Sequence, residues 1–248
     1  MIACVPRPAE WAWLGRVPYA RALRLQEQIR DQVADGRAAD TLLLLEHEPV
    51  ITLGRSANPA NVLASPEDLR KSGIAVVRTS RGGDVTFHGP GQVIGYPVFR
   101  LQRGVRAHVK SMVDGIVATL ASLGIAAEWR ESHPGVWVGP DKICAVGVHV
   151  RRRVATHGFA LNVSIDLAAF RTIVPCGLHD AGVTSIAKVL DSACKLGELG
   201  QQSLRVSMPD EMEMLVQGLS QALAQSFGMR MVRISASSSR LQIANENL

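Results

Sequence analysis

The residues best suited to chemistry lie in one glycine-rich stretch, TSRGGDVTFHGPGQVIGYPVFR, which runs from Thr79 to Arg100. Its glycines would let a ligand approach the backbone closely. Four side chains in it could hydrogen-bond a polar group, namely Arg81, Thr86, His88 and Gln92. Turn formation is the alternative, and it accounts better for Gly89-Pro90-Gly91 than for Arg81-Gly82-Gly83. Composition alone leaves both interpretations open.

Two known phosphate-binding loops do not fit this stretch. A Walker loop needs GK[ST] after its glycines, and none follows here. Gly89, Gly91 and Gly95 miss the spacing of a dinucleotide fingerprint. They also open a strand rather than a helix, so a pyrophosphate would lack a helix N-terminus. What remains is a loop whose glycines allow a ligand to come close.

The cysteines are the other candidates for chemistry. Cys4, Cys144, Cys176 and Cys194 form no CxxC pair, which argues against a structural zinc and against a disulfide scaffold. A reducing cytoplasm is therefore the expected compartment. Cys144 lies in the apolar stretch ICAVGV and is expected to be a small buried hydrophobe, whereas Cys176 lies in the loop-like Pro175-Cys176-Gly177.

Periodicity and turn residues predict the elements that position these groups. Helices are expected at Tyr19–Ala34, Val109–Leu123, Asp166–Phe170 and from Met208 onward; strands are expected at Thr41–Glu46, Val50–Gly54, Ile74–Arg78, Val93–Phe99, Ala126–Arg130, Gly135–Val138, Lys142–Val150 and Val154–Val163. The first two strands read as partners joined by a tight turn at residues 47–49. Pro97 suggests an edge strand or a bulge. The last helix carries an apolar stripe of Met214, Leu215, Leu219 and Leu223.

This mixture of strands and helices predicts an α/β (mixed α+β) fold, a single domain around a mixed β-sheet. We expect the domain to span residues 1–235 and the polar residues 236–248 to form a flexible tail. The chain has 248 residues and a net charge of +5. The start of the sequence does not have the pattern of a signal peptide, and no apolar run is long enough to predict a membrane span. Only Arg151-Arg152-Arg153 is densely basic, and no aromatic platform accompanies it, so an acidic protein partner fits better than nucleic acid.

Several motifs together resemble those of the lipoate-biosynthesis octanoyltransferases. RGGDVTFHGPGQVIGY, from Arg81 to Tyr96, is similar to the family signature. KICAVG from Lys142 resembles its lysine strand, and HGFALN from His157 with IVPCG from Ile173 resembles its cysteine region. The earlier LLLLEHEPVITLGR also fits, so the resemblance covers roughly residues 40–187 in the right order.

The resemblance implies the fold of lipoate and biotin protein ligase catalytic domains. It implies transfer of an octanoyl group from octanoyl-acyl carrier protein to a lysine of lipoyl domains, those of 2-oxoacid dehydrogenases and of the glycine cleavage H protein. No cofactor and no ATP are implied, because the donor is already an activated thioester. The rivals are an ATP-dependent lipoate or biotin ligase of the same fold and a non-catalytic module that binds acyl carrier protein.

The same resemblance assigns roles to particular residues. Cys176 falls at the position of the acyl-thioester nucleophile, and Lys142 at that of its partner. Lys142 would either stabilise the thiolate by its charge or act as a general base. The walls of the acyl-binding slot map onto three segments: Arg81, Gly82, Gly83, Asp84, Val85, Thr86, Phe87 and His88; Ala145, Val146 and Gly147; Gly158, Phe159 and Ala160. Four small residues among these, Ala145, Gly147, Gly158 and Ala160, could serve strand packing as well as leave room for a methylene chain. No metal site is expected.

Overall fold

The computed structural model describes residues 6–175, 182–195 and 209–242, and its larger sheet has nine strands. Eight follow the order β12-β1-β2-β6-β10-β9-β8-β7, and β11 pairs with β9. Their bounds are β1 Arg7–Val17, β2 Asp40–His47, β6 Gln92–Val98, β7 Glu128–Trp129, β8 Gly135–Val138, β9 Asp141–Arg151, β10 Val154–Asn162, β11 Gly182–Val183 and β12 Met229–Arg233. β1 pairs in parallel with both neighbours, whereas β2, β6, β10 and β9 pair antiparallel. The sheet is mixed, as the sequence predicts.

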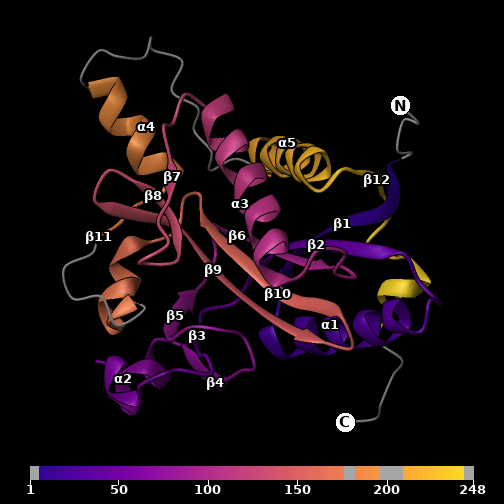
Figure 1. The fold of residues 1–248 in the computed structure, drawn as a ribbon. Coiled ribbons are helices and arrows are strands. Elements are labelled where there is room, and N and C mark those ends of the chain that lie inside the picture. Colours follow the sequence, from indigo (N-terminus) through magenta and orange to yellow (C-terminus); the bar gives the residue numbers. More distant parts are fainter. Residues whose placement is uncertain (1–5, 176–181, 196–208, 243–248) are drawn as a thin grey trace.

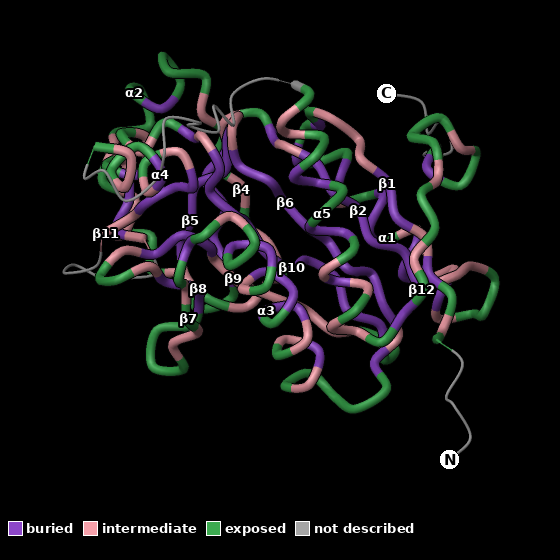
Figure 2. Tube along the Cα trace, turned by 90° about the horizontal axis from the view of Figure 1, so that it is seen from above, coloured by how far each residue is buried: buried purple, intermediate pink, exposed green. Residues whose placement is uncertain are grey.

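Helices cover both faces of this sheet (Figure 1). α1 (Tyr19–Ala34) packs on one face, and α3 (Val105–Ser122) and α5 (Pro209–Phe227) pack on the other. The leucine run of β2 fits this arrangement, because successive side chains of a strand point to opposite faces. Leu43 and Leu45 join the apolar cluster of α1, and Leu42 and Leu44 join that of α3 and α5. β6, in the middle of the sheet, is buried along its whole length (Figure 2).

A second, three-stranded sheet has the order β4-β3-β5. It consists of β3 Val50–Leu53, β4 Ala75–Arg78 and β5 Val85–His88. The predicted pairing of the first two strands is therefore wrong, because β2 and β3 belong to different sheets. β2 is already paired with β1 and β6 on its two sides, which leaves no open edge for β3. The short α2 (Pro66–Lys71) and 3₁₀ turns at Pro59–Asn61 and Leu167–Thr172 surround this sheet.

Pro97 does not mark an edge, since β6 lies between β2 and β10. The ladder between β6 and β10 stops after Gly95 and resumes at Arg100, opposite Val154. Pro97, which has no N–H to donate, lies in this gap.

The structure differs from the expected elements in three other ways. The strand β1 was not predicted at all. α3 begins at Val105, four residues before the predicted start. Met214 is 71% exposed, whereas Leu215, Leu219 and Leu223 are buried, so the apolar stripe of α5 is narrower than expected.

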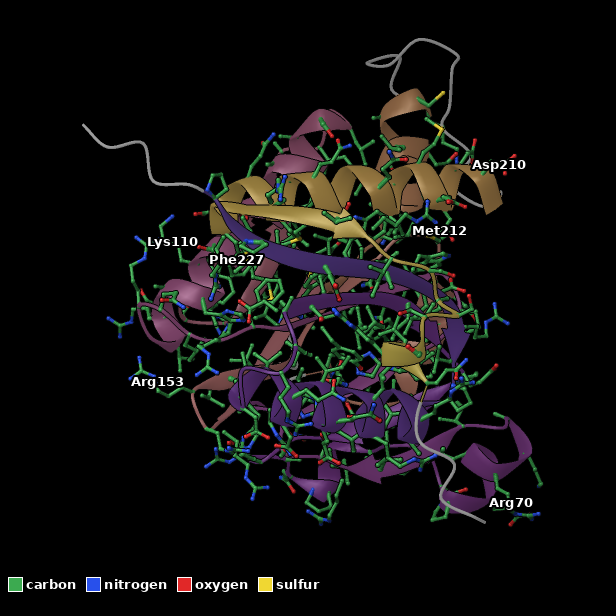
Figure 3. The ribbon with its side chains drawn as sticks, turned by 90° about the vertical axis from the view of Figure 1, so that its right-hand side faces the viewer. Arg70, Lys110, Arg153, Asp210, Met212 and Phe227 are labelled. Atoms are coloured by element: carbon green, nitrogen blue, oxygen red, sulfur yellow. The ribbon has the colours of Figure 1, made fainter. Side chains whose placement is uncertain are left out.

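The C-terminal elements are part of the same architecture. α5 packs against α3, and Phe227 is its last residue (Figure 3). The ring centroids of Phe227 and Phe99 lie 5.1 Å apart. α4 (Ile186–Lys195) contributes Ile186 and Leu190 to the same core. Of the predicted flexible tail, residues 236–242 are described, and they include a 3₁₀ turn at Ser239–Leu241 whose Leu241 is buried against the α1 cluster. Within the described ranges, no helix is long and apolar enough to cross a membrane.

Candidate active site

A cavity of about 290 Å³ lies where the two sheets meet, against β9 and β10. All predicted slot residues line it except Val85 and Phe87. Residues that the sequence analysis did not assign to a binding role also line it: Tyr19, Ser56, Ile94, Tyr96, Ser132, His133, Pro134, Lys142 and His157. Tyr96 and His157 stand inside the quoted motifs, which was the only signal for them in the sequence; nothing local pointed to Tyr19 or to residues 132–134.

β5 explains why two predicted residues are missing from the wall. This segment was expected to be a loop but is a strand, so alternate side chains face opposite ways. Thr86 and His88 line the cavity, whereas Val85 and Phe87 pack into an apolar cluster with Ile51 and other neighbours. Phe87 meets Phe170 edge to face, with centroids 5.7 Å apart.

The four small wall residues divide into two pairs. A β-carbon on Gly147 would lie 2.9 Å from the Gly82 carbonyl oxygen, so this glycine lets the 81–84 loop lie directly on β9. Gly158 similarly accommodates the backbone of Gly95. Ala145 and Ala160 lie opposite each other in the β9–β10 ladder, and both line the cavity. Close backbone packing therefore accounts for the glycines, and the alanines are the small side chains that leave open space.

Arg81 and Asp84 hold the loop at the mouth of the cavity. The Arg81 guanidinium donates to the carbonyl oxygens of Thr52, Gly82 and Asp84 at 2.6, 3.0 and 2.7 Å. The Asp84 carboxylate accepts from the Asn58 N–H at 2.9 Å and from the Asn61 side-chain amide. Both charged groups thus fix the backbone around the cavity.

Lys142, the second residue of β9, is buried, with only 7% of its surface exposed. Its Nζ donates to the Pro134 carbonyl oxygen at 3.3 Å and lies 5.0 Å from the centre of the Trp137 ring. Trp137 is its cross-strand partner in β8. This environment differs from that of an ordinary surface lysine. Burial of an amine is costly unless hydrogen bonds or charge contacts compensate it, and here Pro134 and Trp137 provide such contacts.

Cys176 lies outside the described residues, but the chain on both sides of its segment is described. A second cavity, of about 20 Å³, is lined by Pro175 on one side of that segment and by Gly182 and Val183 on the other. Lys142 lines it too, as do Ala145 and Ala160 of the larger cavity. β11 pairs in parallel with the start of β9, with Val183 opposite Lys142. Pro175 and Gly182, the described residues that flank the segment containing Cys176, therefore both lie at the small cavity that Lys142 lines.

Two other cysteines are described, and the environment of Cys144 contrasts with that of a nucleophile. Cys144 is fully buried in the core, and burial raises the pKa of its thiol to about 12. Thiolate is the reactive form, so this thiol is inert near neutral pH. Cys194 is partly exposed near the end of α4. Cys4 is outside the described residues.

Two buried histidines, His88 and His157, line the cavity, and a third, His47, contacts Tyr96 of the cavity wall. Burial lowers the pKa of His88 and of His157 to about 3. It lowers the pKa of His47 to about 4. These rings are therefore neutral near pH 7 and act as hydrogen-bonding groups. His47 Nε2 lies 2.7 Å from the Tyr96 hydroxyl, and His157 Nε2 lies 3.1 Å from the Ser80 hydroxyl. In the part of the chain that the structure describes, no three His, Cys, Asp or Glu residues are grouped as a metal site.

Known proteins resemble this chain over most of its length. The family model of the lipoyl protein ligase A/B catalytic domain matches residues 18–207. An octanoyltransferase of Solibacter usitatus is 50% identical over 195 residues, which are 77% of this chain and 88% of that protein. An octanoyltransferase of Alkaliphilus metalliredigens is 45% identical over 181 residues, 71% of this chain and 83% of the relative.

Solved structures show the same fold at low sequence identity. Lipoate-protein ligase A bound with ATP aligns with a TM-score of 0.72 at 17% identity, covering 94% of this chain and 91% of the ligase. The bi-partite lipoate protein ligase of Thermoplasma acidophilum, described together with its E2 lipoyl domain, aligns with a TM-score of 0.69 at 16% identity, covering 94% and 89% of the two chains. The predicted ligase-like fold is confirmed.

Proposed function

Since this chain belongs to the octanoyltransferases of the lipoyl protein ligase A/B catalytic domain family, we propose a specific reaction for this acyltransferase of protein lipoylation. The enzyme moves an octanoyl group from octanoyl-acyl carrier protein to a lysine of a lipoyl domain. The group is carried between the two as a thioester on Cys176. One observation carries the mechanistic part. The buried Lys142 lines a small cavity together with Pro175 and Gly182, the described residues on either side of the segment that contains Cys176, and it lines the larger cavity as well. A cytoplasmic location belongs to the same proposal.

In the first half-reaction, the Cys176 thiolate attacks the thioester carbonyl of the donor. A bond forms between Cys176 Sγ and the acyl carbon, the bond to the phosphopantetheine sulfur breaks, and that sulfur leaves and takes up a proton. One thioester replaces another, so little free energy changes. A free thiol has a pKa of about 8.5 and is mostly protonated at neutral pH. Lys142 would raise the thiolate fraction, either by its positive charge or by accepting the proton.

In the second half-reaction, the amine of the lipoyl-domain lysine attacks the acyl-Cys176 carbonyl. The new C–N bond replaces the C–S bond, the amine loses a proton, and the Cys176 thiol is restored. Amide formation from a thioester is strongly downhill, which makes the transfer irreversible. No ATP enters either step, because the donor arrives activated.

The larger cavity would take the acyl chain. Its volume is near the lower end of the range for small-molecule sites, ~300 Å³. Ala145 and Ala160 lie opposite each other in β9 and β10 and line this cavity together with Lys142, Ile94 and Tyr96. Each buried methylene contributes about 0.8 kcal/mol, so the depth of the cavity would select chain length.

The test is intact-mass spectrometry after the protein is mixed with octanoyl-acyl carrier protein. We expect one octanoyl adduct that maps to Cys176 and that disappears when a lipoyl domain is added. Transfer from free octanoate that requires ATP would instead assign a ligase. Binding of the carrier protein without any adduct would assign a non-catalytic module.

A further inference from the structure

A chain of buried hydrogen bonds leads from Arg81 to the inner wall of the small cavity. Arg81 donates to Thr52 Oγ1 from Nε at 3.0 Å and from a terminal nitrogen at 2.9 Å. Thr52 Oγ1 lies 3.3 Å from His88 Nε2, and His88 Nδ1 lies 2.8 Å from Gln92 Oε1. A guanidinium can only donate. The Thr52 hydroxyl therefore accepts from Arg81, and its own hydrogen points to His88 Nε2.

This assignment determines which group donates and which accepts in the remaining hydrogen bonds of the series. His88 is neutral near pH 7, so if Nε2 accepts, Nδ1 carries the hydrogen and donates to Gln92 Oε1. Gln92 must then donate from Nε2, which lies 2.8 Å from Asn162 Oδ1. Asn162 in turn donates from Nδ2 to the Thr184 carbonyl oxygen at 2.9 Å. Every donor meets an acceptor, and neither amide can be reversed without placing two donors or two acceptors together.

The far end of the chain is attached to the Lys142 strand. Thr184 donates its backbone N–H to the Lys142 carbonyl oxygen at 3.0 Å, directly after the β11–β9 pairing. Asn162 and Gln92 also line the small cavity beside Lys142 and Pro175. Asn162 is 4% exposed and Gln92 1%, so solvent cannot replace a lost partner easily.

We propose that Asn162 is a positioning residue of the acyl-transfer site: its amide holds the Thr184 carbonyl and so keeps the chain that follows the cysteine segment against the Lys142 end of β9. Its effect on catalysis rests on the proposed function, whereas the contact itself does not. Small misplacements of reacting groups cost ~100-fold in rate, so one buried amide can matter for a reaction that it does not touch.

The experiment compares two Asn162 variants with the unaltered protein. Asn162→Asp can still accept from Gln92 but cannot donate to Thr184. Asn162→Ser is neutral and too short to bridge the two, and it serves if the aspartate variant does not fold. Thr119→Val is the matched control, because Thr119 is a buried residue of α3 whose hydroxyl donates to Gly115 at 2.9 Å, away from the cavities. Thermal unfolding checks that each variant is folded.

Two readouts are needed. In the Asn162 variants, hydrogen exchange at the Thr184 amide should become roughly tenfold faster, and exchange should be unchanged there in Thr119→Val. Single-turnover octanoylation of Cys176 should slow about 10- to 100-fold, while KM for the octanoyl donor stays within about threefold because the chain cavity is intact. The midpoint pH of Cys176 alkylation should rise toward that of an ordinary thiol.

Folded Asn162 variants with unchanged exchange at Thr184 would overturn the proposal. So would unchanged octanoylation rates and alkylation profiles in those variants. If the unaltered protein itself forms no Cys176 adduct, the proposed function fails, and the exchange experiment alone still decides whether Asn162 holds Thr184.

Discussion

Lys142 passes close beneath the backbone of Gly135, where a β-carbon would lie 2.9 Å from Lys142 Cε and 3.1 Å from Cδ. The same β-carbon would lie 2.8 Å from the Cys144 carbonyl oxygen, so a side chain at residue 135 would displace the lysine and also push β8 away from β9. Gly135→Ala should therefore move Nζ from its place beside Pro134 and Trp137, slow Cys176 octanoylation by about tenfold, and raise the midpoint pH of Cys176 alkylation.

The matched control is Gly139→Ala. Gly139 also has positive φ, at 53°, so alanine there should cost about 1 kcal/mol of stability, yet nothing lies within 4 Å of its β-carbon position. Equal losses of octanoylation in the two folded variants would mean that backbone strain, and not Lys142 placement, governs the rate.

The cysteines should separate sharply in reactivity. At pH 7.5, an alkylating reagent should abolish transfer, and the loss should come from modification of Cys176. Cys144 should stay unmodified, because burial raises the pKa of its thiol to about 12. Cys176→Ala should abolish transfer, whereas Cys144→Ala and Cys194→Ala should retain it. Cys144→Ala should lower stability by about 1 kcal/mol through the small cavity left in the core. Peptide mapping by mass spectrometry identifies the modified residue, and a Cys176→Ala protein with near-normal turnover would rule out the thioester.

Chain-length selection should respond to the paired alanines. Ala160→Val and Ala145→Val add two methyl groups each in side chains that strands tolerate. We expect octanoyl transfer to fall more than transfer of a shorter chain, by about tenfold, measured as the ratio of kcat/KM values. Gly147→Leu is a poor test, because its β-carbon would meet the Gly82 carbonyl at 2.9 Å and shift the loop itself. Equal losses for all chain lengths in folded valine variants would remove the alanines from the slot.

Local patterns predicted much of the fold, and long-range pairing accounts for most of the errors. The helix Tyr19–Ala34 and the strand Gly135–Val138 have the predicted bounds, because caps, glycines and apolar spacing are local signals. The supposed hairpin of β2 and β3 failed because neighbours in sequence were taken as neighbours in a sheet. β1 was missed because RPAEWAWLGRV has no strict alternation, and its burial depends on β2 and β12 on its two sides.

The site shows the same division. The resemblance to the family predicted that Arg81, Ala145 and Ala160 share one slot, which their sequence separation alone could not indicate, and all three line the cavity. The burial of Lys142 could not be predicted, because it depends on Gly135 and Trp137 of β8. Asn162 gave no signal beyond its place in a motif, since its partners Gln92 and Thr184 are 70 and 22 residues away.

Acid stability should depend on His108, whose Nε2 has no hydrogen-bond partner among the described residues. Burial lowers the pKa of His108 to about 4. An unfolded histidine takes up a proton near pH 6.5, so protonation favours the unfolded chain and stability falls as the pH drops from about 6.5 toward 4. His108→Phe, whose ring would sit beside Phe99 and Phe227, should abolish that part of the loss, about 2 kcal/mol at pH 5. Urea unfolding at pH 7.5 and 5.0 measures this loss in the free energy of unfolding, and His133→Gln, at an exposed histidine, is the control. An unaltered acid dependence in His108→Phe would contradict the assignment.

Replacement of Lys142 should distinguish charge from proton transfer. Lys142→Ala removes the amine at the small cavity together with the bond to Pro134, so both half-reactions should slow by about 100-fold or more, with some loss of stability because the side chain is buried.

Lys142→Arg is the sharper variant, since arginine keeps the positive charge but cannot act as a base near neutral pH. If charge alone matters, this variant should keep a low midpoint pH for Cys176 alkylation and should still accept octanoate. If Lys142 carries the proton, both half-reactions of the arginine variant should be as slow as those of the alanine variant. Gly135 limits the room for the larger guanidinium, so thermal unfolding and hydrogen exchange at Thr184 must first show that β9 and β11 remain paired. A folded Lys142→Ala protein that alkylates and transfers with an unchanged pH profile would mean that Cys176 has another activator. The neutral, buried His88, already committed to Thr52 and Gln92, is poorly placed for that role.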